Sequence, residues 1–278
     1  MRTRSWLFVP GDDERKLAKV AASSADVVII DLEDAVATAR KDEARALTGQ
    51  LLADASARHR QTWVRVNAFD THWHSADLAM LAEARPDGYV VPKVNNRDEL
   101  VAIAGTLRLP MLPLTTETAQ AVQALTRYTD LPDNVIGLTW GAEDLAAELG
   151  AATNRDEVGH WLAPFELARS WCLVAARANA IAPIDTVYTD FRDNAGLLAY
   201  ATASRRLGFD GMMAIHPGQI EQIHAGFRPD PVELEYARGV LDAFASADST
   251  GVAALDGRML DEPHRRQAQR LLALADDT

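Results

Sequence analysis

Two carboxylates of the sequence, Glu117 and Asp144, follow short apolar runs at the points where those runs end. The runs read "MLPLTTE" (111–117) and "VIGLTW" (135–140). If the runs are neighbouring strands, their carboxylates lie side by side and suit Mg²⁺, which proteins hold through one or two carboxylates completed by water and ligand oxygens. Few His residues lie nearby, which disfavours zinc. We therefore expect a magnesium site.

A purely structural alternative stays open for the same two residues. Glu117 would then pair with Lys93 or Arg65, and Asp144 would cap a helix. Position 147 is Ala, so no Glu or Gln follows Asp144 at the spacing of a capping box, which weighs against simple capping.

Arg65 and Lys93 end two further apolar runs, "WVRVN" (63–67) and "GYVVPKV" (88–94). A cation where a helix begins is electrostatically unfavourable, so each requires a carboxylate or an anionic ligand as partner. Bound Mg²⁺ chelates an α-keto acid and acts as a Lewis acid on its carbonyl. Arg65 would bind a carboxylate or stabilise a developing enolate. Together these groups suit making or breaking a carbon–carbon bond next to a carbonyl.

Eight short apolar runs, separated by helical stretches, must position these side chains. None alternates cleanly with polar residues, as expected of strands buried on both faces. Eight strand–helix repeats predict a (β/α)8 barrel, whose chemistry sits at the carboxyl ends of its strands. A doubly wound open sheet is the alternative, but "VPGDDER" after the first run is not the glycine-rich phosphate turn of such folds. The remaining runs are 6–10, 27–34, 184–190 and 211–217.

The pattern changes after Pro217. A short last barrel helix is followed by a helix beginning near "PDPVELEY", a hairpin-like turn in "DSTGVAALDG" and a final helix in "EPHRRQAQRLLALA". We therefore divide the chain into a barrel (1–228) and a C-terminal helical extension (229–278) that packs on its own or a neighbouring barrel.

The composition excludes several classes of protein. A net charge of −12 without a Lys/Arg block argues against a nucleic-acid binder. No apolar run is long enough for a membrane span, and the N-terminal apolar piece is too short for a signal peptide. The single cysteine, Cys172, excludes an internal disulfide and favours a cytoplasmic protein. In its helical context this thiol is expected to be buried and inert.

The motifs, taken together and in order, resemble one family. They are "RSWLFVPG", "VVIIDLEDAV", "VRVN", "VPKV", "ETA", "WGAEDLAAELG", "IDTVYTDFRD", "GFDGMMAIHPGQI" and "GRMLDEP". The chain resembles the citrate lyase β-subunit-like (CitE-like) branch of the HpcH/HpaI aldolase superfamily, which includes malyl-CoA and citramalyl-CoA lyases. The resemblance implies a Mg²⁺-dependent barrel, commonly a homotrimer or hexamer. Its members cleave a 3-hydroxyacyl thioester reversibly into an acyl thioester, such as acetyl-CoA, and an α-keto acid.

The resemblance also implies roles for individual residues. Glu117 and Asp144 match the metal ligands, and Arg65 matches the residue that binds the substrate carboxylate or carbonyl. Asp261 in "GRMLDEP" matches an acid/base Asp that the extension supplies to a neighbouring subunit's site, although an Asp there could simply start the following helix. The backbone amides of Gly141, Ala142 and Glu143 would hold the keto-acid carboxylate, while Glu33, Asp34 and Lys93 would lie just outside and the acids would orient metal-bound water.

Contacts with coenzyme A are expected from Arg4 and Lys16, near the first strand, although Lys16 could equally lie on a solvated helix face. Two positions depart from the family pattern. Ala121 stands where Gly is usual, which would narrow the pocket, and Met212 replaces a frequent Lys. These departures keep two alternatives open: a CoA-independent Mg²⁺ aldolase, and a β subunit of a citrate lyase complex that uses an acyl-carrier thioester. His216 and Asp190 are expected to be structural.

Overall fold

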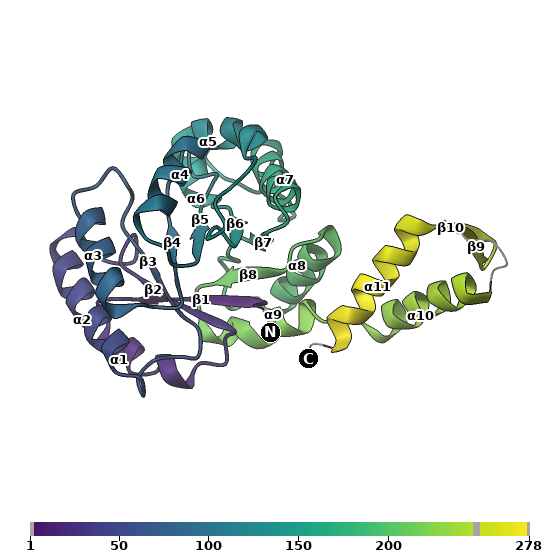
Figure 1. Ribbon diagram of the computed structural model, residues 1–278, viewed down its shortest axis with the longest axis horizontal. Helices are drawn as coiled ribbons and strands as arrows, with labels where there is room; N and C mark the ends of the chain where they lie inside the picture. Colours follow the sequence, from purple (N-terminus) through teal and green to yellow (C-terminus); the bar gives the residue numbers. More distant parts are fainter. Residues whose placement is uncertain (1–2, 247–250, 277–278) are drawn as a thin grey trace.

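A computed structural model of the chain describes residues 3–246 and 251–276. Eight parallel strands form a barrel surrounded by helices, and a separate C-terminal extension projects from it (Figure 1). Isolated parallel bridges, Met111 to Val135 and Leu114 to Thr139, join the first and last strands of the sheet and close it. The predicted (β/α)8 barrel is thus confirmed, and the open sheet is excluded. The strands are β1 Ser5–Pro10, β2 Val27–Asp31, β3 Thr62–Arg65, β4 Gly88–Val91, β5 Met111–Pro113, β6 Gly137–Thr139, β7 Ala182–Asp185 and β8 Gly211–Ala214.

Helices follow the strands in sequence and cover the outside of the barrel (Figure 1). Those after β5 and β6 are short, and a longer helix, α7, packs behind β6 and β7. None of the helices within the described residues is both long and apolar enough to cross a membrane. The barrel helices are α1 Glu14–Leu17, α2 Lys41–Ala53, α3 His74–Ala84, α4 Arg97–Thr106, α5 Ala119–Ala124, α6 Glu143–Leu149, α7 Ala163–Ala178, α8 Asn194–Leu207 and α9 Ile220–Gly226.

The strands lack polar alternation because both of their faces are buried. In β2, Val27 and Ile29 join an apolar cluster with Trp63 and Leu112 of other strands. The alternate residue Val28 belongs to the larger cluster that also contains helix residues. Side chains alternate across a strand, so one set fills the barrel and the other meets the helices.

The C-terminal extension consists of α10 (Pro231–Ser246), a hairpin of β9 (Val252–Leu255) and β10 (Arg258–Asp261), and α11 (Glu262–Asp276). The two helices pack against each other around an apolar cluster of their own. The hairpin lies at the end of the extension farthest from the barrel (Figure 1). The extension therefore includes strands besides the predicted helices.

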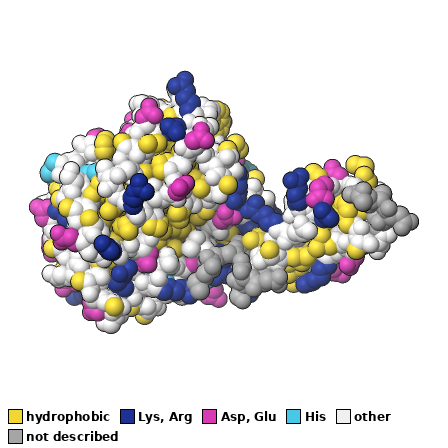
Figure 2. All heavy atoms as spheres, viewed as in Figure 1, with side chains coloured by type: hydrophobic (Ala, Val, Ile, Leu, Met, Phe, Trp, Pro, Cys, Tyr) yellow, Lys and Arg dark blue, Asp and Glu magenta, His cyan; other side chains and the backbone are white. Residues whose placement is uncertain are grey.

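Ion pairs fix the base of the extension to the barrel. Arg205 of α8 contacts Glu233 of α10 at 2.6 Å, and Arg270 of α11 contacts Asp210 at 3.0 Å. Lys and Arg side chains gather where the extension meets the barrel (Figure 2). The division at residue 228 remains a prediction.

A buried ion pair stabilises the wall behind β6 and β7. Asp185 is fully buried and contacts Arg169 of α7, with Nη2 and Oδ2 2.6 Å apart. The same carboxylate accepts a 2.6 Å hydrogen bond from Trp140 Nε1. Trp140 immediately precedes the Gly141 turn, so this network ties the end of β6 to β7 and α7.

Asp185→Asn should destabilise the fold by about 3–5 kcal/mol, because it leaves the buried Arg169 guanidinium with only the exposed Glu166, 3.9 Å away, as a counter-charge. The matched change Glu43→Gln removes an exposed partner of Arg40 and should cost less than about 1 kcal/mol. Urea unfolding of both variants measures the difference. Equal, small losses in the two variants would contradict a structural role for the buried pair.

Candidate active site

Arg65, at the carboxyl end of β3, is held by two acidic residues. Its Nε and Nη2 donate to the two carboxylate oxygens of Asp31 at 2.7 and 2.6 Å, and its Nη1 lies 2.9 Å from Glu33 Oε2. Burial alone would raise the pKa of Asp31, but the charge and hydrogen bonds of Arg65 hold it below its ordinary value. The guanidinium also lies 4.8 Å from the ring centroid of Phe8. Arg65 is therefore fixed in position by the protein.

Asp31 is a site residue that the sequence pattern did not single out, because Glu33 and Asp34 follow it more conspicuously after the apolar run. It is the last residue of β2, and its carboxylate also accepts the backbone N–H of Glu33 at 2.9 Å. The Asp that ends "VVIID" could have indicated this role, since a buried strand carries a charged side chain only where a partner neutralises it.

Lys93 links several carboxylates after β4. Its Nζ lies 2.7 Å from Glu33 Oε1 and 3.5 Å from both Asp34 Oδ1 and Asp144 Oδ1. Lys93 also has a positive φ of 55°, an uncommon backbone conformation for a residue other than glycine. The predicted need of Arg65 and Lys93 for carboxylate partners is met within the protein.

Glu117, beyond the end of β5, is buried and makes no ion pair with a cationic side chain among the described residues. Its Oε2 accepts the backbone N–H of Lys93 at 2.5 Å. Burial, with the nearby charges of Glu33 and Asp144, raises the pKa of Glu117 to about 8. The charge of Arg65 acts to lower this pKa, but neither Arg65 nor Lys93 forms an ion pair with Glu117 among the described residues, as the structural alternative would require.

Asp144 lies in the first turn of α6 and is not its cap. The N-cap position is Ala142, and no side chain makes a capping hydrogen bond there. The Asp144 carboxylate is about one-third exposed. Elsewhere in the barrel, Asp13, Asn96 and Thr118 cap their helices through their side chains. The Asp144 carboxylate therefore lies near Lys93 and lines the cavity.

The turn between β6 and α6 brings backbone close to Glu117. A Cβ atom on Gly141 would lie 3.1 Å from Glu117 Cγ, a tight contact. The Gly141 amide donates to Thr116 Oγ1, whereas those of Ala142 and Glu143 meet no acceptor within the described part of the chain. The Glu143 side chain accepts a 2.9 Å hydrogen bond from Asn154. Of the three amides predicted to bind an anion, two remain available.

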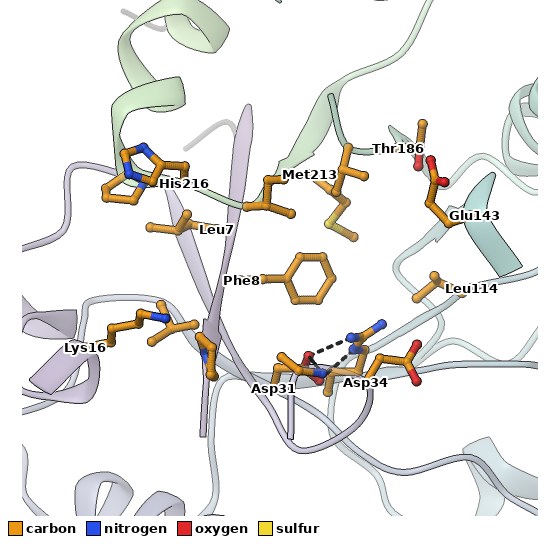
Figure 3. Close-up of a pocket in the computed structure, with 18 of the residues that line it drawn as sticks. Leu7, Phe8, Lys16, Asp31, Asp34, Leu114, Glu143, Thr186, Met213 and His216 are labelled. Carbon is orange, nitrogen blue, oxygen red and sulfur yellow. Dashed lines mark hydrogen bonds and ion pairs between the residues drawn. The ribbon is translucent and has the colours of Figure 1, made fainter. Parts of the chain in front are cut away.

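A cavity of about 870 Å³ opens at the carboxyl ends of the strands, and Arg65, Glu117 and Asp144 line it. One side is apolar, formed by Phe8, Leu114, Val187 and Met213, a group we call the apolar wall. In Figure 3, Phe8 points into the middle of the cavity, and Lys16 lies on the opposite side from Leu114.

The carboxylates at this mouth suit a divalent cation of the hard, oxygen-preferring class. Residues 3–246 and 251–276 contain no group of three or more His, Cys, Asp and Glu side chains placed to hold a metal. Glu117 and Asp144 could therefore supply two protein ligands, with water and substrate oxygens completing the shell. The buried Glu117 carboxyl, which lacks a cationic partner, fits this role.

The predicted contact of Arg4 with coenzyme A is not supported. Arg4 precedes β1 at the opposite end of the barrel, and it does not line the cavity. Its Nε lies 3.0 Å from Asp26, which is buried, and its backbone N–H donates to the same carboxylate at 2.8 Å. Arg4 balances a buried charge at the start of β2. Lys16, in contrast, does line the cavity, at an exposed position.

Asp261 does not reach the cavity of its own chain. It lies on β10, at the far end of the extension, and contacts His264 Nδ1 at 2.5 Å (Figure 1). The two departures from the family pattern also lie outside the cavity lining, because Ala121 and Met212 are buried elsewhere. The expectation that Ala121 narrows the pocket is therefore wrong.

The remaining candidates keep structural contacts. His216 lines the cavity, stacks on Phe191 with ring centroids 5.0 Å apart, and accepts the Gly218 N–H through Nδ1. Asp190 accepts the backbone N–H of Arg192. Cys172 is fully buried, as expected.

Comparisons with known proteins point to one family. The family model described as HpcH/HpaI aldolase/citrate lyase matches residues 4–217. A (3S)-malyl-CoA thioesterase of Cereibacter sphaeroides is 40% identical over 277 residues, which cover 98% of this chain and 94% of the relative. The mitochondrial citramalyl-CoA lyase of Rattus norvegicus is 32% identical over 295 residues, covering 98% and 86%. A crystal structure of Mycobacterium tuberculosis CitE with magnesium, acetoacetate and coenzyme A has a TM-score of 0.88 at 34% identity, covering 99% and 98% of the chains.

The raised pKa of Glu117 predicts a pH-dependent stability in buffer containing a chelator. Between the ordinary value of 4.5 and about 8, the folded protein retains a proton that the unfolded chain has released, so the free energy of unfolding falls as pH rises. Glu117→Gln should remove this part of the pH dependence. Mg²⁺ should raise the Tm of the wild type, increasingly up to about pH 8, because binding must displace that proton.

Thermal unfolding from pH 5 to 9, with and without Mg²⁺, measures both effects. Glu99→Gln, which alters a carboxylate outside the cavity lining, serves as the control. Parallel curves for the wild type and Glu117→Gln, with the same Mg²⁺ response, would show that Glu117 is neither the titrating group nor a ligand.

Proposed function

The chain belongs to the HpcH/HpaI aldolase/citrate lyase family, and from this premise we propose that it is a Mg²⁺-dependent carbon–carbon lyase. Its substrate would be a 3-hydroxyacyl-CoA of the malyl or citramalyl type, cleaved into an acyl-CoA and an α-keto acid. One observation carries the proposal: Glu117 and Asp144 line the same cavity as Arg65, and Glu117 lacks a cationic partner among the described residues. Mg²⁺, when bound there, supplies a Lewis acid for the substrate oxygens.

Arg65 would bind the oxygen at which negative charge develops. Asp31 accepts hydrogen bonds from Nε and Nη2, and Glu33 Oε2 lies 2.9 Å from Nη1 as an ion pair without accepting a hydrogen bond. This leaves an N–H on both Nη1 and Nη2 without a hydrogen-bond acceptor among the described residues. Because the guanidinium is already oriented, little reorganisation accompanies the reaction. The free amides of Ala142 and Glu143 would hold the keto-acid carboxylate, and Glu33 and Asp34 would orient metal-bound water.

Coenzyme A would leave the cavity past the rim formed by α1 and the residues that follow it. Lys16 and Lys19 line this rim and are exposed, so they can meet phosphate groups without burying a charge. Lys16 thus remains a candidate contact, and Lys19 takes the place of Arg4 beside it. The CitE structure with coenzyme A supports a thioester ligand in this family.

Asp261 would supply the acid/base carboxylate to a neighbouring subunit. During cleavage it would accept the proton of the substrate 3-hydroxyl as the carbon–carbon bond breaks. Its position far from its own barrel favours action between subunits, in a homotrimer or hexamer. Exposed Val252 and Met259 on the same hairpin offer apolar surface for such packing.

Thioester hydrolysis is the second candidate function, favoured by the 40% identical relative named as a malyl-CoA thioesterase. The two activities give different products. A lyase releases acetyl-CoA and a keto acid, whereas a thioesterase releases free coenzyme A and the hydroxy acid. A CoA-independent aldolase or a carrier-dependent citrate lyase subunit would leave free CoA esters unchanged.

Incubation with malyl-CoA and citramalyl-CoA, followed by chromatography of the CoA species, tests the proposal. We expect acetyl-CoA with glyoxylate or pyruvate, and loss of activity with EDTA that Mg²⁺ restores. Arg65→Met should lower kcat/KM by about 100-fold or more, as removal of a donor to a developing oxyanion does. Free coenzyme A as the sole thiol product would replace lyase by thioesterase.

Mixed oligomers test the role of Asp261. Asp261→Asn and Arg65→Met should each be nearly inactive alone, and subunits of the two variants mixed and reassembled should regain part of the wild-type rate. The gain arises because a site can combine an intact Arg65 with a neighbour's intact Asp261. Mixing Arg65→Met with Glu117→Gln is the control, since both changes affect the same barrel and no neighbour repairs it. Full activity of Asp261→Asn alone would exclude a catalytic carboxylate there.

A further inference from the structure

Resting on the function proposed above, we infer that the site selects α-keto acid units with a hydrogen or alkyl substituent on the carbonyl carbon. It discriminates against a substituent that carries a second carboxylate. In terms of CoA esters, malyl-CoA and citramalyl-CoA are substrates, and citryl-CoA is a poor one.

The apolar wall is the first observation behind this selectivity. Leu114 and Met213 are almost fully buried, and Phe8 and Val187 pack against the same cluster. Phe8 also lies beside Arg65, so the wall borders the polar part of the cavity directly. These side chains offer no hydrogen-bond donor to a carboxylate. They favour contact with a hydrogen or a methyl group.

The cations of the site are already engaged. Arg65 is bound to Asp31 and Glu33, and Lys93 to Glu33 and two further carboxylates. The other cations that line the cavity within the described residues, Lys16 and Lys19, are exposed at the rim. Lys16 lies across the cavity from Leu114 (Figure 3). Arg65 lies beside Phe8, but its remaining N–H groups are assigned above to the reacting oxygen. No other described cation that lines the cavity is placed at the apolar wall for a second carboxylate.

The excess of carboxylates around the cavity also disfavours binding of a second carboxylate. Among the described residues, two cations, Arg65 and Lys93, lie near six carboxylates at the inner end of the cavity, which are Asp31, Glu33, Asp34, Glu117, Glu143 and Asp144. Even with a divalent cation bound, this set stays negative overall. An additional carboxylate would be both repelled and desolvated. The loss of affinity should be about tenfold or more, since a buried charged group without partners loses at least ~1–3 kcal/mol.

Two acids of the same shape separate charge from size. Oxaloacetate carries CH₂–COO⁻ on its carbonyl carbon, and 4-methyl-2-oxopentanoate carries CH₂–CH(CH₃)₂, which has the same branching without charge. Their binding to the Mg²⁺-loaded protein, measured by isothermal titration calorimetry beside pyruvate, is the test. We expect the neutral acid to bind about tenfold or more tightly than oxaloacetate. Equal affinity of the two acids, or tighter binding of oxaloacetate, overturns the inference.

A matched pair of variants locates the effect. Val187→Lys places a cation on the apolar wall through a flexible stem, and Ile215→Lys adds the same charge at an exposed position of the cavity rim. Val187→Lys should shift the affinity ratio toward oxaloacetate about tenfold, and Ile215→Lys should leave it near the wild-type value. Equal shifts in both variants would show that overall charge, and not the wall, sets the selectivity.

Turnover separates failure of this inference from failure of the proposed function. If citryl-CoA is cleaved as fast as citramalyl-CoA, the selectivity is refuted and the lyase assignment stands. If no ester is cleaved and none of the acids binds, the proposed function fails, and the selectivity fails with it.

Discussion

The balance of charge among buried carboxylates is the constraint on which the barrel mouth depends. Asp31 and Glu33 are neutralised by Arg65 and Lys93, and these contacts hold both cations in fixed positions. Glu117 is left out of this pairing, and burial raises its pKa to about 8. A carboxyl in that state either keeps its proton or takes a cation, so a bound metal would replace that proton.

The closure of the barrel places this carboxyl next to Asp144. Strands β5 and β6 pair through isolated bridges, and the two carboxylates follow these strands. The Trp140–Asp185–Arg169 network fixes the end of β6, so the following turn can approach Glu117 closely. The barrel thus holds Glu117 and Asp144 close together without a full set of cationic partners. Both lie at the carboxyl ends of the strands, where barrels of this kind carry their functional residues.

The strands, the barrel and the strand-end acids could be predicted because they depend on local signals. Buried parallel strands read as short apolar runs, and their charged ends stand out against them. The contact predicted between Arg4 and coenzyme A was not supported, because a position near the first strand in the sequence does not tell at which end of the barrel the residue lies. The partner of Arg65 was missed, since Asp31 reads as part of an apolar strand until β2 and β3 are paired. The distance of Asp261 from the cavity of its own chain depends on the direction in which the extension leaves the barrel, and no short sequence motif determines that direction.

The central claim is that Glu117 and Asp144 together hold a divalent cation. Crystals grown with Mn²⁺ in place of Mg²⁺, and an anomalous difference map at the manganese edge, test it most directly. The account predicts one strong peak at about 2.0–2.2 Å from a carboxylate oxygen of each residue, a typical distance for these oxygen-ligated ions. A well-ordered cavity without a peak between Glu117 and Asp144 at millimolar Mn²⁺, or a peak on other residues, would contradict it.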